Sequence, residues 1–107
     1  MKVLLDECVP VQVRLALPGH EVASVPRLGW GSISNGELLE AAEQAGYEVF
    51  VIADKNLRYQ QNLAGRRLAI VELWTNHRPT LERHFDRIRL AVEGVSPGQY
   101  YIVEPPA

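Results

Sequence analysis

The chain has a single cysteine, few aromatic residues and no long uninterrupted apolar segment among its 107 residues. One cysteine excludes an internal disulfide framework and is typical of a reducing compartment. No stretch approaches the roughly 18 uncharged apolar residues of a membrane-spanning helix. The apolar run 3–5 stops at an acidic pair, which is not the pattern of a signal peptide. We therefore expect a cytoplasmic protein that does not enter a membrane.

The composition is that of a folded globular protein. Apolar residues make up 47% of the chain and charged residues 22%, a balance that argues against disorder. A chain of this length buries enough surface for one core but not for two. We expect a single domain over residues 1–107.

Short apolar runs alternate with helical patterns along the chain. The runs predict strands over 2–5, 20–25, 48–53, 68–74 and 99–104, and the apolar spacing predicts helices over 9–17, from Ser34 to Gly46, and in one long piece from Pro79. This alternation predicts an α/β domain with three α/β/α layers and a mainly parallel sheet. The last strand is the exception, because it could instead pair antiparallel at an edge.

The two most apolar strands should lie side by side at the centre of the sheet, where both faces are covered. Each is followed by an acid, Asp6 after the first and Asp54 after the other. Glu37 stands in the first turn of the helix that begins at Ser34. Ligands of open α/β sheets bind beyond the carboxyl ends of the strands, where the strand order reverses. We therefore expect Asp6, Glu37 and Asp54 to converge there.

Carboxylates held close together raise each other's pKa unless a cation lies between them. Oxygen ligands in a roughly octahedral arrangement suit Mg²⁺ or Mn²⁺. Such an ion lowers the pKa of a bound water and stabilises charge that builds up on a phosphoryl group. The three acids thus predict metal-assisted hydrolysis of a phosphodiester, with Glu7 as a further candidate ligand.

Each acid also has a purely structural explanation. Ser34 and Glu37 have the spacing of a capping box, and Glu7 could simply favour a helix dipole. Glu40 and Glu43 are expected on a solvated helix face. Cys8 is expected to be a small buried apolar residue.

Charge is distributed unevenly along the chain. Residues 1–54 hold three cations and eight anions, a net of −5, whereas residues 55–89 hold eight cations and three anions, a net of +5. This asymmetry suggests a cation-binding region beside an anion-binding one. The candidate contacts to nucleic acid after the strand at 48–53 are Lys55, Arg58, Tyr59, Gln61 and Asn62, followed after the next strand by Asn76 and Arg78. Arg66 and Arg67 could also pair with phosphates.

Several segments together resemble the PIN-like domains of small prokaryotic proteins, relatives of the VapC-type toxins. The matching segments are VLLDECVP at 3–10, GHEV at 19–22, LGWGSISNGELLEAA at 28–42, GYEVFVIADKNL at 46–57 and QQN at 60–62. Within the family the chain is most similar to the group that opens with LLDE and a following proline.

The resemblance implies an Mg²⁺- or Mn²⁺-dependent endoribonuclease that acts as the toxin of a toxin–antitoxin pair. It implies metal ligands at Asp6, Glu37 and Asp54, RNA as substrate, a small antitoxin as partner, and a homodimer as a further expectation. Asn35 and Asn56 stand where many relatives carry acids, and amides add no negative charge. A catalytically silent module that binds protein or RNA is therefore an alternative.

A phosphoacceptor receiver domain is a second alternative, because it too places acids after the first and third strands. Receivers need a lysine beyond the last strand, and the end of this chain, YYIVEPPA, has none.

Overall fold

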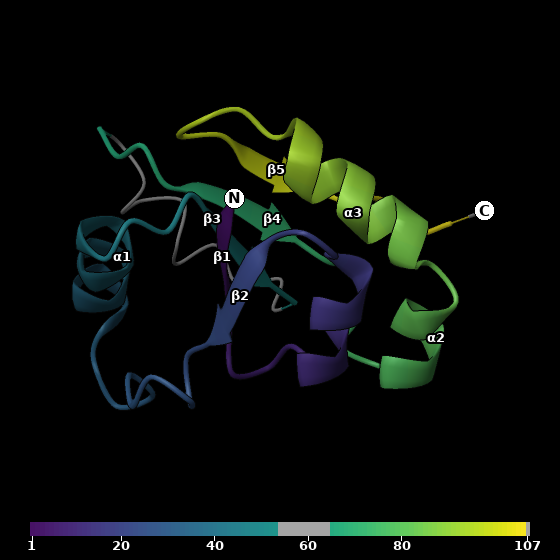
Figure 1. The fold of residues 1–107 in the computed structure, drawn as a ribbon, viewed down its shortest axis with the longest axis horizontal. Helices are drawn as coiled ribbons and strands as arrows, with labels where there is room; N and C mark the ends of the chain where they lie inside the picture. Colours follow the sequence, from purple (N-terminus) through teal and green to yellow (C-terminus); the bar gives the residue numbers. More distant parts are fainter. Residues whose placement is uncertain (54–64, 107) are drawn as a thin grey trace.

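The computed structural model describes residues 1–53 and 65–106 as a three-layer α/β domain (Figure 1). Its strands are β1 (Lys2–Leu5), β2 (Glu21–Ser24), β3 (Val49–Ile52), β4 (Ala69–Glu72) and β5 (Tyr100–Ile102). They form one five-stranded sheet in the order β2-β1-β3-β4-β5, and every pair is parallel. The α/β class and the parallel sheet are confirmed, and the antiparallel alternative for the last strand is wrong.

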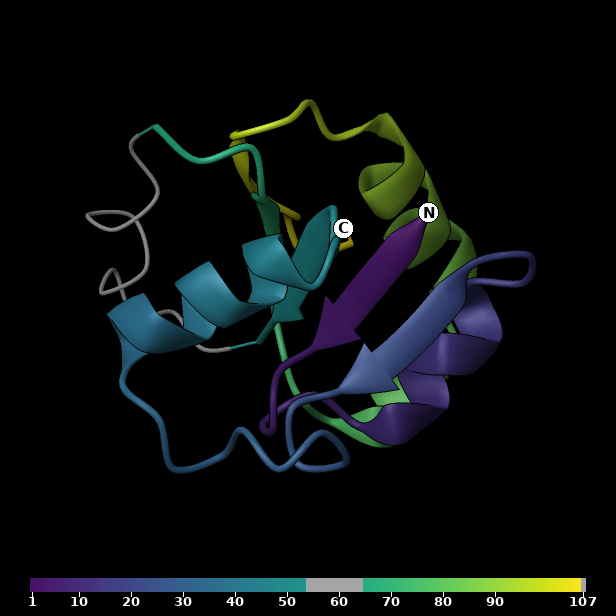
Figure 2. The same cartoon turned by 60° about the vertical axis from the view of Figure 1, so that its left-hand side comes forward.

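Helices cover both faces of the sheet. The 3₁₀ helix η1 (Val11–Ala16) and the α-helices α2 (Arg78–Glu82) and α3 (Phe85–Gly94) lie on one face, and α1 (Asn35–Gln44) lies on the other (Figure 2). We refer to these as the α3 face and the α1 face. Strand residues alternate between the two, so that Leu5 and Val51 point to the α3 face while Leu4 and Phe50 point to the α1 face.

The central position expected for the two most apolar strands is confirmed. β1 pairs directly with β3, and all four residues of β3 are buried. A strand covered on both faces must be apolar throughout, which is why residues 49–52 show no alternation of polar and apolar side chains. The strand order reverses between β1 and β3, since the chain leaves β1 toward β2 and leaves β3 toward β4.

Two of the expected helices differ from the structure. The helix expected over 9–17 is only the six-residue η1, where Val11 and Leu15 are exposed and Val13 and Ala16 buried. The buried pair is three residues apart and the exposed pair four, so this short helix still has one apolar face. The single long helix expected from Pro79 is two helices, α2 and α3, divided at Arg83 and His84. Leu81 and Ile88, one on each side of the division, both lie in the core on the α3 face.

The last crossover differs in hand from the first two. β1 to β2 and β4 to β5 step in opposite directions across the sheet, yet their connecting helices lie on the same face. The crossover from β2 to β3 runs over the opposite face and therefore has the hand of the first. Because parallel crossovers are right-handed in almost all proteins, the β4–β5 connection is the exception here.

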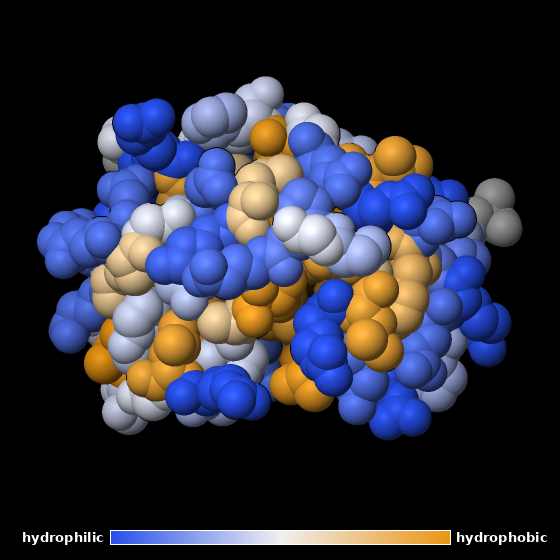
Figure 3. Space-filling view, in the orientation of Figure 1, coloured by the Kyte–Doolittle hydropathy of each residue, from blue (hydrophilic) through white to orange (hydrophobic). Residues whose placement is uncertain are grey.

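The surface is mixed in character. On the face shown in Figure 3, apolar atoms form separate patches among hydrophilic ones. Among the described residues, no helix has the length and apolar character needed to cross a membrane.

Candidate functional site

The carboxyl edge of the sheet carries an acid at its centre. Asp6 directly follows β1, and its backbone N–H donates to the carbonyl of Val51 in β3 at 2.9 Å. This bond continues the parallel ladder by one residue and places Asp6 beside Ile52. Asp6 therefore lies where the strand order reverses, which is the expected location.

Asp6 is buried, with only 4% of its surface exposed. Its carbonyl accepts the N–H of Val9 at 3.0 Å, and its Oδ2 accepts the thiol of Cys8 at 3.1 Å. A thiol is a weak donor. Among the described residues, no cation forms an ion pair with the Asp6 carboxylate. A buried carboxylate with so little compensation is suited to a cationic ligand.

Asp54 was predicted to stand beside Asp6, but it lies outside the described residues. Asn56 and the predicted nucleic-acid contacts Lys55, Arg58, Tyr59, Gln61 and Asn62 lie outside them as well. The first described segment ends at Ala53, which follows β3 and directly precedes Asp54 in the sequence.

Glu37 lies in the first turn of α1, as predicted, and is exposed. The Oγ of Ser34, the N-cap residue, accepts the Glu37 backbone N–H at 3.4 Å. The reciprocal bond of a capping box, from the Ser34 N–H to the Glu37 carboxylate, is not among the hydrogen bonds of the described residues. The serine thus caps the helix, and the glutamate carboxylate is left for another role.

Glu7 and Cys8 lie beside Asp6 in the chain but differ in their surroundings. Glu7 is exposed, and its carboxylate faces the loop at Gly31, where an added Cβ would lie 3.6 Å from Oε2. Cys8 is half-buried. It packs against the core of the α3 face, as expected of a small apolar residue, but it is not fully buried and its thiol also donates to Asp6.

Glu72 is a buried acid that the sequence analysis missed as a site residue. It ends β4 opposite Ile52, so that Asp6 and Glu72 flank Ile52 on the same face. Two strand spacings, about 10 Å, separate their backbones, with Ile52 between them. The hydroxyl of Tyr100 donates to Glu72 Oε1 at 2.6 Å. An acid inside the apolar run 68–74 was the available signal, since buried acids are rare without a partner.

Within residues 1–53 and 65–106, no three His, Cys, Asp or Glu side chains lie close enough to hold a metal ion together. Asp6, Glu7 and Glu37 therefore do not make a metal site by themselves. Mg²⁺ is often bound through one or two carboxylates, with water completing its coordination. A site of three protein ligands that includes Asp6 therefore requires a ligand from outside the described residues.

Asn76 and Arg78 lie where the sequence placed them, beyond the carboxyl end of β4. Asn76 is exposed in the loop before α2. Arg78 begins α2, and its Nε lies 3.6 Å from the Glu82 carboxylate one helical turn later. Both side chains can be approached from solvent at the edge of the sheet that carries Asp6.

Arg66 has a different role from the expected one. Its guanidinium lies 2.8 Å from Glu40 Oε2 and 4.0 Å from Glu43 Oε1, both on α1. The Arg66 hydrogen bond, together with one from Gln44, holds the pKa of Glu40 below its ordinary value. Glu43 also accepts the backbone N–H groups of Arg67 and Leu68 at 2.6 and 3.1 Å. Glu40 is exposed, as expected for a solvated helix face, but both acids also contact the segment before β4, which was not expected.

Comparison of the chain with protein-family models, with curated proteins and with solved structures finds no match. The residues and their arrangement are therefore what indicate function.

Proposed function

We propose that this protein is a metal-dependent endoribonuclease of the PIN-like type. The observation that carries the proposal is the position of Asp6: a buried carboxylate at the reversal of strand order, with a thiol as its side-chain hydrogen-bond partner. Open parallel sheets bind their ligands at that point. Asp54 follows the neighbouring strand β3 by two residues in the sequence, which supports a two-carboxylate site.

In this proposal Asp6 and Asp54 hold Mg²⁺ or Mn²⁺, and Glu37 approaches from the first turn of α1. When bound, the ion would lower the pKa of a water and stabilise charge on the phosphoryl group. The backbone bonds of Asp6 to Val51 and Val9 fix its main chain at the end of β1. Asn76 and Arg78 would contact RNA phosphates or sugars at the rim.

The uneven charge distribution supports RNA as the substrate. Lys55 and Arg58 belong to the segment of net positive charge that directly follows β3 in the sequence. Arg66 is a weaker candidate for binding an RNA phosphate, since its guanidinium forms an ion pair with Glu40 on α1. The toxin role and the antitoxin partner rest on the resemblance to VapC-type toxins, and the cytoplasmic location rests on the single cysteine and the N-terminal pattern. These and a homodimer are part of the proposal.

The proposal is tested with single-stranded RNA and the purified protein. Cleavage should require Mg²⁺ or Mn²⁺, stop on addition of EDTA and be restored by excess Mn²⁺. Asp54→Asn should remove cleavage and leave the thermal unfolding midpoint nearly unchanged. Cleavage that survives both EDTA and Asp54→Asn would exclude the metal mechanism.

A catalytically silent binding module is the second candidate. The observation in its favour is that Asp6, Glu7 and Glu37 do not form a three-ligand group within the described residues. Calorimetric titration with Mn²⁺ separates the two, because the nuclease proposal requires binding that Asp6→Asn weakens.

A receiver-like phosphoacceptor is a third candidate, because the strand order β2-β1-β3-β4-β5 is also the flavodoxin-like order. The residues after β5 contain no lysine to pair with a phosphoryl group. Incubation with acetyl phosphate followed by intact-mass measurement would detect a phosphoacceptor directly.

A further inference from the structure

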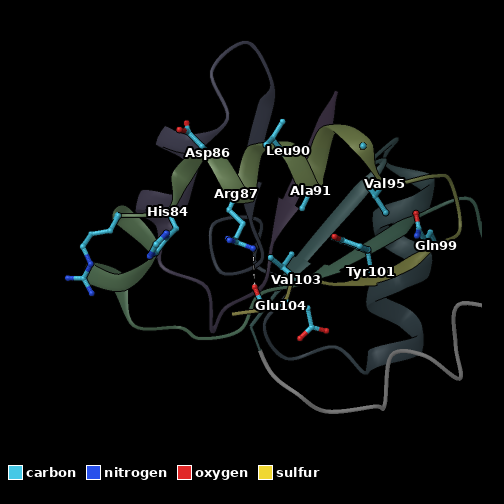
Figure 4. A pocket seen from close by; sticks show the side chains of 12 residues that line it. His84, Asp86, Arg87, Leu90, Ala91, Val95, Gln99, Tyr101, Val103 and Glu104 are labelled. Atoms are coloured by element: carbon cyan, nitrogen blue, oxygen red, sulfur yellow. Dashed lines mark hydrogen bonds between the residues drawn. The ribbon is translucent and has the colours of Figure 1, made fainter. Parts of the chain in front are cut away.

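A groove lies between α3 and β5, at the opposite edge of the sheet from β2. It encloses about 910 Å³ and is lined along α3 by Leu90, Ala91 and Val95 and along β5 by Tyr101 and Val103 (Figure 4). Leu90 is 65% exposed and Tyr101 42% exposed. Large apolar side chains that remain this exposed beside a groove favour a binding surface.

β5 is the last strand of the sheet, and the pattern of its hydrogen bonds shows which peptide groups face outward. The Gln99 carbonyl accepts from Ile70, and the Val103 N–H donates to Glu72, so alternate residues of β5 turn their peptide groups toward β4. Ile102 lies between Tyr101 and Val103 and therefore turns its N–H and C=O away from β4. None of the hydrogen bonds formed among residues 1–53 and 65–106 uses these two groups. An edge of this kind can accept another strand.

The charges around the groove favour an acidic ligand. Within the described residues Arg83 has no ion pair, and Arg87 donates only to the Glu104 carbonyl, at 3.5 Å. Of the nearby acids, Asp86 lies 3.7 Å from Arg89. This leaves two guanidinium groups and the Glu104 carboxylate without a described ion pair. Carboxylates are the natural partners of two such arginines.

We propose that the α3–β5 groove binds an extended acidic peptide segment of a partner protein, which adds to β5 as a further strand. The backbone of the segment would pair with Ile102, its apolar side chains would cover Leu90 and Tyr101, and its acidic side chains would reach Arg83 and Arg87. A second copy of this chain fits less well, because its own groove would bring Arg83 and Arg87 but only one acid without a described ion pair, Glu104. This inference does not depend on the nuclease proposal, because the groove is formed by a different edge of the sheet.

The test uses a short fluorescein-labelled peptide of alternating valine and threonine that ends in glutamates. Fluorescence polarisation with the full chain should show saturable binding. Arg87→Glu should weaken it at least about tenfold, since it reverses a charge at the rim. The same peptide ending in lysines is the matched control and should gain affinity for the Arg83→Glu, Arg87→Glu double variant. Absence of saturable binding up to about 1 mM would overturn the proposal.

Strand addition is tested separately from charge. A peptide that is N-methylated at the residues facing β5 loses the donors it needs, so it should bind at least about tenfold more weakly. Equal binding of the methylated peptide would overturn strand addition. Sedimentation across a range of protein concentrations tests the other occupant, and a dimer that Ile102→Pro abolishes would assign the groove to a second copy instead.

Discussion

The two ends of α1 use their acids in opposite ways. In its second half, Glu40 and Glu43 reach the residues just before β4 through Arg66 and through two backbone N–H groups. At its beginning, near the carboxyl edge, Glu37 is exposed and forms no ion pair among the described residues. Asp6, at the centre of the same edge, has the Cys8 thiol as its side-chain hydrogen-bond partner.

The difference between the two ends of α1 indicates which charges hold the fold together and which are left for a ligand. Acids matched by cations and backbone donors fix α1 against the sheet, and their removal should affect stability. Acids left without such partners contribute little to folding, and their removal should affect binding and chemistry. A single variant at either end of α1 can contradict this division between stabilising acids and ligand-binding acids.

The largest effect is expected at the carboxyl edge. Asp6→Asn keeps the shape of the side chain and an acceptor for Cys8 but removes the charge. We expect RNA cleavage to fall about 100-fold or more, the scale seen when one electrostatic group is removed from an active site. The measurement is the initial cleavage rate at saturating Mn²⁺.

The matched control is Asp86→Asn, which removes an exposed acid from α3. Its cleavage rate should equal that of the wild type. If both variants lose activity to the same extent, the loss reflects overall charge and not the site at Asp6.

At the other end of α1 we expect a loss of stability without loss of activity. Glu43→Ala removes the acceptor of the Arg67 and Leu68 N–H groups and should lower the free energy of unfolding by about 2 kcal/mol. Urea denaturation followed by circular dichroism measures this change. Glu43→Gln keeps an acceptor oxygen and should lose clearly less. Cleavage that falls together with stability in the folded Glu43→Ala protein would contradict the division.

A smaller effect is expected at Cys8. Its thiol donates to Oδ2 of Asp6, a candidate metal ligand in the proposed site. Cys8→Ala frees that oxygen, so Mn²⁺ should bind roughly a few-fold more tightly, in line with the modest net value of a hydrogen bond. Isothermal titration calorimetry measures the affinity. Cys8→Ser restores a donor and should reverse the gain, and a weaker affinity in Cys8→Ala would place the metal elsewhere.

The smallest effect concerns Glu40. Its pKa is lowered first by the Arg66 hydrogen bond and then by Gln44. A carboxyl group with a lowered pKa in the folded state stabilises the protein above its ordinary pKa, and this contribution is lost as the pH falls through the folded value. In Arg66→Ala the pKa of Glu40 should rise toward its ordinary value of 4.5. NMR titration of the side-chain carboxyl carbon measures the shift, and an unchanged pKa would show that Gln44 alone maintains it.

The strands other than β2 were predictable because each is an apolar run ended by a polar residue. Residues 2–5 and 48–53 carry enough Val, Leu and Ile to require cover on both faces, so their central position followed from burial alone. The division between α2 and α3 was not predictable, because apolar residues continue in helical register from Leu81 to Val92. The break at Arg83 and His84 therefore has no counterpart in the apolar pattern of the sequence.

The candidate site was predictable in part for the same reason. Asp6 follows a strand whose burial the sequence dictates, and Glu37 follows the N-cap Ser34, so local patterns fixed both places along the chain. The partner of Arg66 was not predictable, because Glu40 and Glu43 lie more than twenty residues away and their contact depends on how α1 lies across the sheet.

By itself the amino-acid sequence determined which segments become strands, which face of α1 is apolar and which residues follow each strand, because these depend on neighbours a few positions apart. The tertiary structure alone decided that Asp6 is buried beside β3 with a thiol partner, that Glu72 meets Tyr100, and that the β4–β5 crossover takes the opposite hand. Each of these depends on segments that are distant in the chain, and their contact is set by the packing of the whole domain.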